Sequence, residues 1–212
     1  GSGKTTLVRS ILQLVRAQSG TIEFAGTSTL ETNRKSLSSI RRDIALVFQD
    51  PIGSLSPRMT VGNSVREALR HGAAQPESEQ HEIEKLFTLV GLPVDFIQRY
   101  PHELSGGQAR RVCVARALAQ EPRMIIADEP TAGLDVSIQG EILNLLAKLQ
   151  EKLQLPILIV THNLNVVRHI SDRMVIMLMG KIVEHGSTEE IFSSPQHDYT
   201  RRLLDSNDHP LP

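Results

Sequence analysis

Apolar residues along the chain fall into short uninterrupted runs and longer stretches with helical spacing. Three runs, at residues 44–49, 124–129 and 156–162, have the length and composition of buried strands. Residues 174–186 predict two further strands about Gly180. Between the second and third runs, one face of a helix is apolar: Ile138, Ile142, Leu145, Leu146, Leu149 and Leu153. Because strands and helices alternate, the pattern predicts an α/β fold with a mostly parallel, doubly wound sheet.

The N-terminal part has a weaker pattern. Residues 21–26 alternate between polar and apolar side chains like a strand and end in a turn. Ahead of them, apolar residues recur at helical spacing: Leu7, Ile11, Leu14 and Val15. This spacing predicts a helix that begins at Thr5 or Thr6 and packs on that face.

The middle of the chain changes character, because helical spacing dominates from Pro51 to about Ala119. A long helix follows Gly107, and the polar stretch 72–80 is the best loop candidate. We expect residues 51–118 to form a helical subdomain inserted into an α/β core made of residues 1–50 and 119–212. The apolar positions that support this are Val61, Val65, Leu69, Ile83, Leu86, Phe87 and Val90.

Composition narrows the class of protein. The 212 residues include 23 basic and 24 acidic ones, and this balance argues against a nucleic-acid binder that relies on bulk positive charge, although a small local patch stays open. No apolar run approaches the ~18 residues of a membrane span. The one cysteine, Cys113, cannot form an internal disulfide, which suits a reducing compartment.

The opening GSGKTT has the chemistry of a phosphate-binding loop that runs into a helix N-terminus. A full loop of this type needs a leading strand and an earlier glycine, which we expect to lie ahead of this chain. Lys4 is placed to contact the β and γ phosphates, Thr5 to ligate Mg²⁺, and Thr6 to hydrogen-bond a phosphate. The other residues expected to bind phosphate are Gly1, Ser2 and Gly3. A plain glycine-rich turn is the alternative.

Polar residues end each of the three apolar strands: Gln49, then Asp128 and Glu129, then His162. Because ligands collect beyond the carboxyl ends of parallel strands, we expect these side chains at one edge of the sheet. Mg²⁺ takes one or two carboxylates, so Asp128 is the candidate metal partner and Glu129 the candidate base for an attacking water. A helix-capping acidic pair is the alternative for Asp128 and Glu129.

A second glycine-rich turn, LSGGQ at residues 104–108, also precedes a helix. It offers amide donors and a hydroxyl to an anion but carries no lysine of its own. Such a half site suits a two-fold dimer in which each nucleotide lies between Lys4 of one subunit and Ser105 of the other. The residues of the half site are Ser105, Gly106, Gly107 and Gln108. The alternative is a simple capped-helix turn.

Taken in order, these motifs resemble those of the nucleotide-binding subunits of ABC transporters, from Gly1 to about Leu204. The resemblance implies the P-loop NTPase fold, with ATP and Mg²⁺ as ligands. It implies that Gln49 contacts Mg²⁺ or its water and reports nucleotide state to a membrane partner. His162 is implied to bind the γ-phosphate and Asp135 to communicate across the dimer; a structural role is the alternative for His162.

Two segments, residues 47–62 and residues 194–204, resemble the peptide and nickel importer branch of that family. An amphipathic C-terminal helix is a compatible interpretation of the second segment. The chain departs from the family pattern at Ala109, at Ala132 with Gly133, and at Asn163, where a basic or amide residue, Ser-Ala and an acidic residue are usual. None of these departures removes a candidate catalytic group.

The resemblance implies an ATP-hydrolysing subunit that energises uptake of peptides, nickel or a metal chelate at the cytoplasmic face of the membrane. Its implied partners are a second ABC ATPase subunit, identical or related, separate permease subunits and, indirectly, an extracytoplasmic solute-binding protein, with no nucleic acid. The rival hypothesis is a soluble ABC ATPase acting on nucleic acid or the ribosome. A binding-only or inert fragment is a third, because we expect these 212 residues alone to bind ATP weakly.

Overall fold

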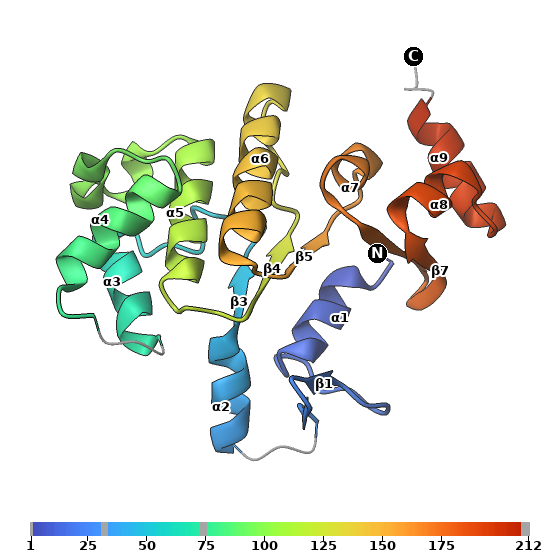
Figure 1. The fold of residues 1–212 in the computed structure, drawn as a ribbon, viewed down its shortest axis with the longest axis horizontal. Helices are drawn as coiled ribbons and strands as arrows, with labels where there is room; N and C mark the ends of the chain where they lie inside the picture. Colours follow the sequence, from blue (N-terminus) through green and yellow to red (C-terminus); the bar gives the residue numbers. More distant parts are fainter. Residues whose placement is uncertain (1, 31–33, 73–75, 209–212) are drawn as a thin grey trace.

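The computed structural model describes residues 2–30, 34–72 and 76–208 (Figure 1). At its centre lies a parallel sheet of β3 (Ile44–Val47), β4 (Met124–Asp128) and β5 (Ile157–Val160), with β4 in the middle. These strands coincide with the three apolar runs, so the predicted α/β fold with a parallel sheet is confirmed. All three carboxyl ends meet at one edge of the sheet.

Helices cover both faces of this sheet (Figure 1). One face packs against α6 (Val136–Leu153), and the other against α1 (Lys4–Ile11) and α2 (Arg34–Asp43). Alternate side chains of β4 point to opposite faces of the sheet. Ile125 packs in the hydrophobic cluster that contains α6, and Ile126 packs in the cluster that contains α1. The sheet is therefore doubly wound.

Two short hairpins accompany the sheet. The pair β6 (Arg173–Leu178) and β7 (Lys181–Ser187) is antiparallel and turns at Met179 and Gly180, both with positive φ. The pair β1 (Glu23–Phe24) and β2 (Thr27–Ser28) is also antiparallel, and its strands are shorter than the predicted strand at 21–26. Apolar side chains of β6 form a third cluster with α7 (Leu164–Ile170), α8 (Thr188–Ser193) and α9 (Asp198–Asp208).

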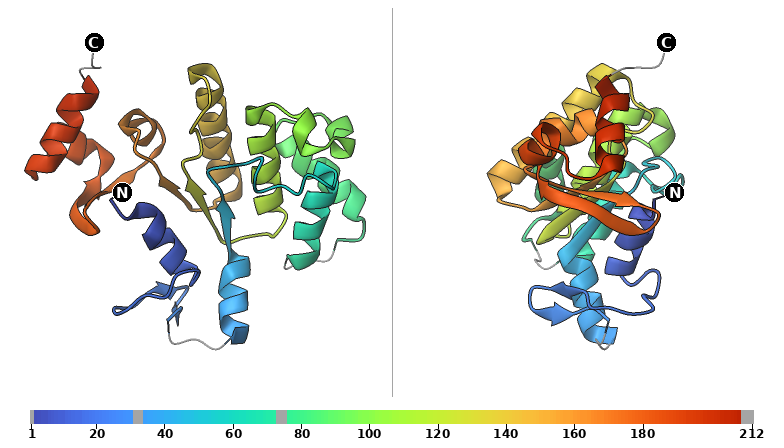
Figure 2. Two further views of the ribbon diagram at one scale, coloured as in Figure 1. Left: turned by 180° about the vertical axis from the view of Figure 1, so that it is seen from behind. Right: turned by 90° about the vertical axis from the view of Figure 1, so that its right-hand side faces the viewer.

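A group of helices lies at one end of the molecule, beside β3 and away from β6 and β7 (Figures 1 and 2). It consists of α3 (Val61–His71), α4 (Glu79–Leu89), α5 (Gly106–Leu118) and the short 3₁₀ helices η1 (Val94–Gln98) and η2 (Pro101–Glu103). Its buried side chains include Val65, Phe87 and Val112, and they form one continuous core with α6 and its face of the sheet. Part of the predicted loop at 72–80 lies outside the described residues, and Glu79 and Gln80 already belong to α4.

The predicted apolar face of the first helix is wrong at three of its four positions, since of the predicted residues only Ile11 packs against the core cluster that contains Val8. The helix begins at Lys4 and ends at Ile11, and Leu7, Leu14 and Val15 are 41%, 54% and 40% exposed. Val8 and Leu12 are buried instead. For Leu14 and Val15 the reason is that Gln13 adopts φ 53, so the helical spacing does not extend to the residues after it.

Candidate functional site

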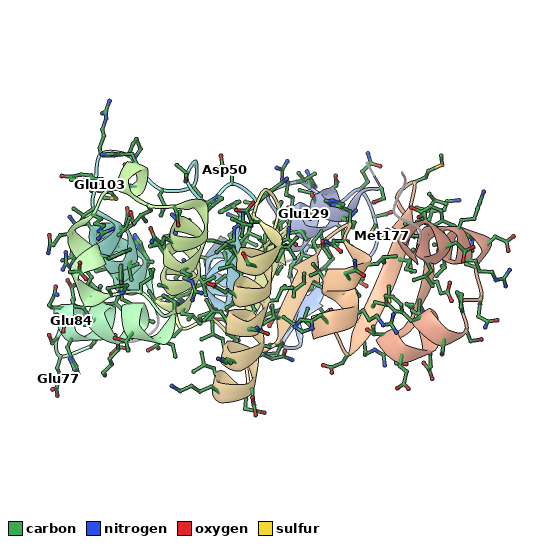
Figure 3. The ribbon with its side chains drawn as sticks, turned by 90° about the horizontal axis from the view of Figure 1, so that it is seen from above. Asp50, Glu77, Glu84, Glu103, Glu129 and Met177 are labelled. Carbon is green, nitrogen blue, oxygen red and sulfur yellow. The ribbon has the colours of Figure 1, made fainter. Side chains whose placement is uncertain are left out.

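The carboxyl ends of the three parallel strands meet the start of α1, as the sequence predicts. Figure 3 shows Glu129 midway along the molecule, with Asp50 on the side of α5 and Met177 on the side of α8 and α9. The amide of Glu129 donates to the carbonyl of Val160 at 2.8 Å, which ties the end of β4 to the end of β5. The strand ends are thus joined at the point where the candidate residues gather.

The phosphate-loop residues lead into α1 through Gly3, whose φ of 94 places it in the left-handed region. The loop also rests on the β6–β7 turn, because the Gly180 amide donates to the Ser2 carbonyl at 3.0 Å. A Cβ on Gly3 would lie 3.3 Å from the Gly180 Cα, so this position favours glycine for space as well as conformation. Gly1, also predicted here, lies outside the described residues.

The first turn of α1 presents the groups that the sequence predicts for anion binding. The Lys4 Nζ donates to the Ser2 Oγ at 3.1 Å, which holds the ammonium over the loop. Thr5 and Thr6 are exposed. The first amide groups of any α-helix have no intrahelical acceptor, and they carry the positive end of the helix dipole. This end of α1 can therefore receive a phosphate.

Asp128 is buried at the end of β4, only 8% exposed, and it accepts a hydrogen bond from the Thr5 hydroxyl. Within the described residues its Oδ1 has no hydrogen-bond partner. Burial raises the pKa of the Asp128 carboxyl, the charge of Glu129 raises it further, and the Thr5 hydrogen bond opposes the rise. A buried carboxylate oxygen without a partner, beside a hydroxyl, is a good fit for a hard cation such as Mg²⁺.

No cluster of three or more histidine, cysteine, aspartate or glutamate side chains able to hold a metal occurs in residues 2–30, 34–72 and 76–208.

Glu129 and His162 lie in direct contact. The Oε1 of Glu129 is 2.7 Å from the Nδ1 of His162, and its Oε2 accepts a hydrogen bond from the Thr161 hydroxyl at 3.2 Å. The Glu129 side chain is 15% exposed and the His162 side chain 78%. Both carboxylate oxygens are therefore held, while the histidine ring remains open to a ligand.

The LSGGQ turn forms a capping box at the start of α5. Ser105 accepts from the Gln108 amide at 3.3 Å, and the Gln108 side chain accepts from the Ser105 amide at 3.0 Å. This is the capped-helix turn that the sequence offers as the alternative interpretation. Gly107 permits close packing, because a Cβ there would lie 2.8 Å from the Ile138 Cγ2. Gly106 and the exposed Ser105 stand at the same helix end.

Ser105 and Lys4 begin helices that pack on opposite faces of β4. Asp135 is the exposed N-cap residue of α6, and its side chain makes no capping hydrogen bond. Gln49 is exposed two residues beyond β3. The structure thus brings Lys4, Thr5, Asp128, Glu129 and His162 to one edge of the sheet, with Gln49 at the same edge.

Sequence reasoning misses one residue next to the site, Arg110. It is 2% exposed, and its guanidinium reaches the carbonyls of Gln49 and Glu129. The signal was present in α5, where Arg110 shares a helix face with the apolar residues Cys113 and Ala117.

Comparisons with known proteins agree with this geometry. The chain is 46% identical over 205 residues to the glutathione import ATP-binding protein GsiA of Pectobacterium atrosepticum, which covers 96% of this chain and 33% of GsiA. It is 43% identical over 206 residues to the oligopeptide transport ATP-binding protein OppF of Escherichia coli, covering 96% of this chain and 62% of OppF. The chain therefore spans about a third of the GsiA relative.

Two solved structures share the fold. The dimeric, post-hydrolysis ATP-binding cassette MJ0796 with ADP and Pi superposes with a TM-score of 0.77 at 32% identity, covering 88% of this chain and 81% of that one. CbiO1 from Clostridium perfringens, part of the ABC transporter complex cbiONQ, gives a TM-score of 0.82 at 31% identity, covering 91% and 76%. In the described residues no helix is long and apolar enough to cross a bilayer.

The family model described as ABC transporter matches residues 1–132, well over half of the chain. That segment contains the phosphate loop, the LSGGQ turn and the strand that ends in Asp128 and Glu129. From this match, the chain belongs to the ABC transporter family.

Proposed function

We propose that this chain binds ATP with Mg²⁺ and hydrolyses it as the ATP-binding subunit of an importer. The observation that carries the proposal is the contact between Glu129 and His162, 2.7 Å apart, at the sheet edge that also holds Lys4, Thr5 and Asp128. A partly buried carboxylate held by two neighbours, beside a helix N-terminus that can receive a phosphate, is suited to activating water against a phosphoryl group.

Binding of the phosphates falls to the loop and the first turn of α1. Residues 1–6 supply amide donors, the Lys4 ammonium and the Thr6 hydroxyl. The hydrogen bond from Lys4 to Ser2 keeps the ammonium close to the loop, so little reorganisation is needed to receive the anion.

Thr5, Asp128 and Gln49 are the residues that would hold Mg²⁺. When bound, the ion neutralises negative charge that develops on the phosphate oxygens. The hydroxyl of Thr5 and the Oδ1 of Asp128, which has no hydrogen-bond partner among the described residues, would supply the oxygen donors. Gln49 would reach the ion or its water from the loop after β3.

Glu129 orients the attacking water and accepts its proton, and His162 contacts the γ-phosphate. The Thr161 hydroxyl and the His162 ring together fix the two carboxylate oxygens of Glu129. Little covalent chemistry is required of the protein, because phosphoryl transfer depends mainly on positioning and charge stabilisation.

The same proposal includes a dimer in which Ser105, Gly106, Gly107 and Gln108 of one subunit close over the nucleotide of the other, with Asp135 at the contact. The dimeric state of MJ0796 and the exposure of Ser105 and Asp135 support it. Residues 51–118 would form the helical subdomain that contacts the permease subunits at the cytoplasmic face of the membrane. Residues 1–50 and 119–212 would form the nucleotide-binding core.

Peptides are the cargo class that the relatives favour. GsiA is named for glutathione import and OppF for oligopeptide transport, whereas nickel and metal chelates rest on the importer-branch resemblance alone. The rival activity on nucleic acid or the ribosome receives no support from these names. Recovery of two membrane proteins with the chain, rather than ribosomes or DNA, is the expected copurification result.

Binding of Mg-ATP to the full-length gene product tests the first step. Lys4→Met should weaken ATP binding about 10- to 100-fold, since a charge-assisted hydrogen bond contributes about 1.5–3 kcal/mol. Lys85→Met, which removes an exposed ammonium paired with Glu82 on α4, should leave affinity unchanged. Equal affinity of the two variants would remove Lys4 from the phosphate site.

A further inference from the structure

Arg110 is a buried cation surrounded by backbone carbonyls. Its Nη1 donates to the Glu129 carbonyl at 2.8 Å, and its Nη2 donates to the carbonyls of Gln49 and Ala132, both at 3.1 Å. These three acceptors belong to two segments, because Gln49 lies in the loop after β3 whereas Glu129 and Ala132 lie in the turn between β4 and α6. One guanidinium in α5 therefore joins the two loops that carry candidate catalytic residues.

This arrangement is costly for stability alone. Arg110 is 2% exposed, and in the part of the chain that the structure describes no carboxylate forms an ion pair with it and its Nε has no partner. Burial lowers the pKa of the Arg110 guanidinium. Among the described residues the Asp50 carboxylate attracts the guanidinium without forming an ion pair, and burial outweighs this attraction. A buried charge with so weak a counter-charge is generally unfavourable, so this position indicates a role that an apolar side chain could not fill.

The backbone conformation of Glu129 indicates what this role is. Glu129 has φ 49, and a residue other than glycine in the left-handed region costs about 1–3 kcal/mol. Its amide is held by the Val160 carbonyl and its carbonyl by Arg110, so both flanking peptide groups are fixed. With the backbone fixed in this way, the carboxylate points at His162 and Thr161.

We propose that Arg110 is a positioning residue for ATP hydrolysis. It holds the strained backbone of Glu129 and the loop that contains Gln49 in fixed positions relative to each other. This inference rests on the proposed function, because it assigns Arg110 its effect through Glu129. The same side chain links these loops to α5, whose N-terminus carries Ser105. Movement of α5 would therefore be transmitted to the catalytic carboxylate.

The neighbouring Arg111 provides a matched control. It also donates to a backbone carbonyl, that of Val90 at 2.8 Å, and it pairs with Glu141 at 2.9 Å. Neither acceptor is a candidate site residue, since Val90 is the C-cap of α4 and Glu141 belongs to α6. Arg111→Gln and Arg110→Gln remove the same number of donors from adjacent positions of one helix, and only the second should affect catalysis.

Steady-state hydrolysis of ATP by the full-length gene product is the first measurement. Arg110→Gln should lower kcat by about 10- to 100-fold with little change in KM, because small displacements of a catalytic group cost rates of this order. Arg111→Gln should retain wild-type kcat. Arg110→Lys, which keeps the charge and one strong donor, should restore part of kcat. If Arg110→Gln does not fold, Arg110→Lys takes its place in the measurement.

A double-mutant cycle separates positioning from general loss of structure. If Arg110 acts through Glu129, adding Arg110→Gln to Glu129→Gln should lower the residual rate much less than it lowers the wild-type rate. Multiplicative losses, or equal kcat for the Arg110 and Arg111 variants, would overturn the inference.

Hydrogen exchange distinguishes failure of this inference from failure of the proposed function, since it needs no hydrolysis. Arg110→Gln should speed amide exchange at Glu129 and at Ala132, whose amide donates to the Glu129 carbonyl, and Arg111→Gln should not. An inactive wild type with this exchange pattern would refute the ATPase function but keep the structural role of Arg110. An active wild type with unchanged exchange would refute the role of Arg110 alone.

Discussion

Replacing Asp128 by asparagine should stabilise the nucleotide-free protein while abolishing hydrolysis. The carboxylate is 8% exposed and one oxygen has no partner among the described residues. A buried polar atom without a partner costs about 1–3 kcal/mol, and more when it is charged. Asparagine keeps the shape and can still accept from Thr5, so we expect a gain of about 1–2 kcal/mol from the lost charge.

The pH dependence identifies the source of this gain. Folding raises the pKa of Asp128 above its ordinary value of 3.8. Burying the ionised carboxylate therefore costs folding free energy, and this cost is zero below pH 3.8 and reaches its full size above the folded-state pKa. The stability advantage of Asp128→Asn should therefore be greatest at neutral pH and shrink as the pH falls through the folded-state pKa.

Thermal unfolding in a chelator, at neutral and mildly acidic pH, measures the effect. For a domain of this size, about 1–2 kcal/mol corresponds to a rise in Tm of about 2–8 °C. Asp205→Asn, which neutralises an exposed carboxylate in α9, is the matched control and should leave Tm unchanged. A variant that melts no higher than wild type at neutral pH, or with an advantage independent of pH, would refute the reasoning.

Two further predictions concern glycines in helices. Gly107→Ala should lower stability by about 1–3 kcal/mol, because the added Cβ would lie 2.8 Å from Ile138. Gly106→Ala should cost less, because its Cβ would lie 3.4 Å from Leu134, an ordinary contact distance. Chemical denaturation of the two variants measures the difference. Gly140→Ala in α6 should raise stability by about 0.5–1 kcal/mol, because in the part of the chain that the structure describes nothing beyond its own helix turn lies within 4 Å of the added Cβ. An unchanged or lower Tm would contradict this.

Much of the sheet could be predicted because parallel strands carry a strongly apolar pattern, although the predicted burial of the third strand is wrong at Leu158, which is 37% exposed. The runs that contain Ile44, Ile125 and Ile159 fall on β3, β4 and β5, and the shared direction of these strands brings Gln49 and Glu129 to one edge. The pattern therefore predicted the sheet and the gathering of these side chains at its edge.

Other features depend on tertiary contacts that no local pattern contains. The buried face of α1 was mispredicted because Gln13 ends the helix in a left-handed conformation. The contact of Glu129 with His162 depends on the backbone conformation of Glu129. The hydrogen bonds of Arg110 reach Gln49, which is 61 positions away in the sequence, and Glu129, which is 19 positions away. At Asn163, where the family pattern has an acidic residue, the side chain caps α7, a role that aspartate could also fill.

The most direct test of the account is ATP turnover by the full-length gene product with Glu129→Gln, measured beside ATP binding. The account predicts retained binding and a rate lowered by about 10²–10⁴-fold, the usual contribution of a general base. Glu77→Gln, an exposed carboxylate far from Glu129 in Figure 3, should hydrolyse ATP like wild type. Wild-type turnover by Glu129→Gln would contradict the central claim.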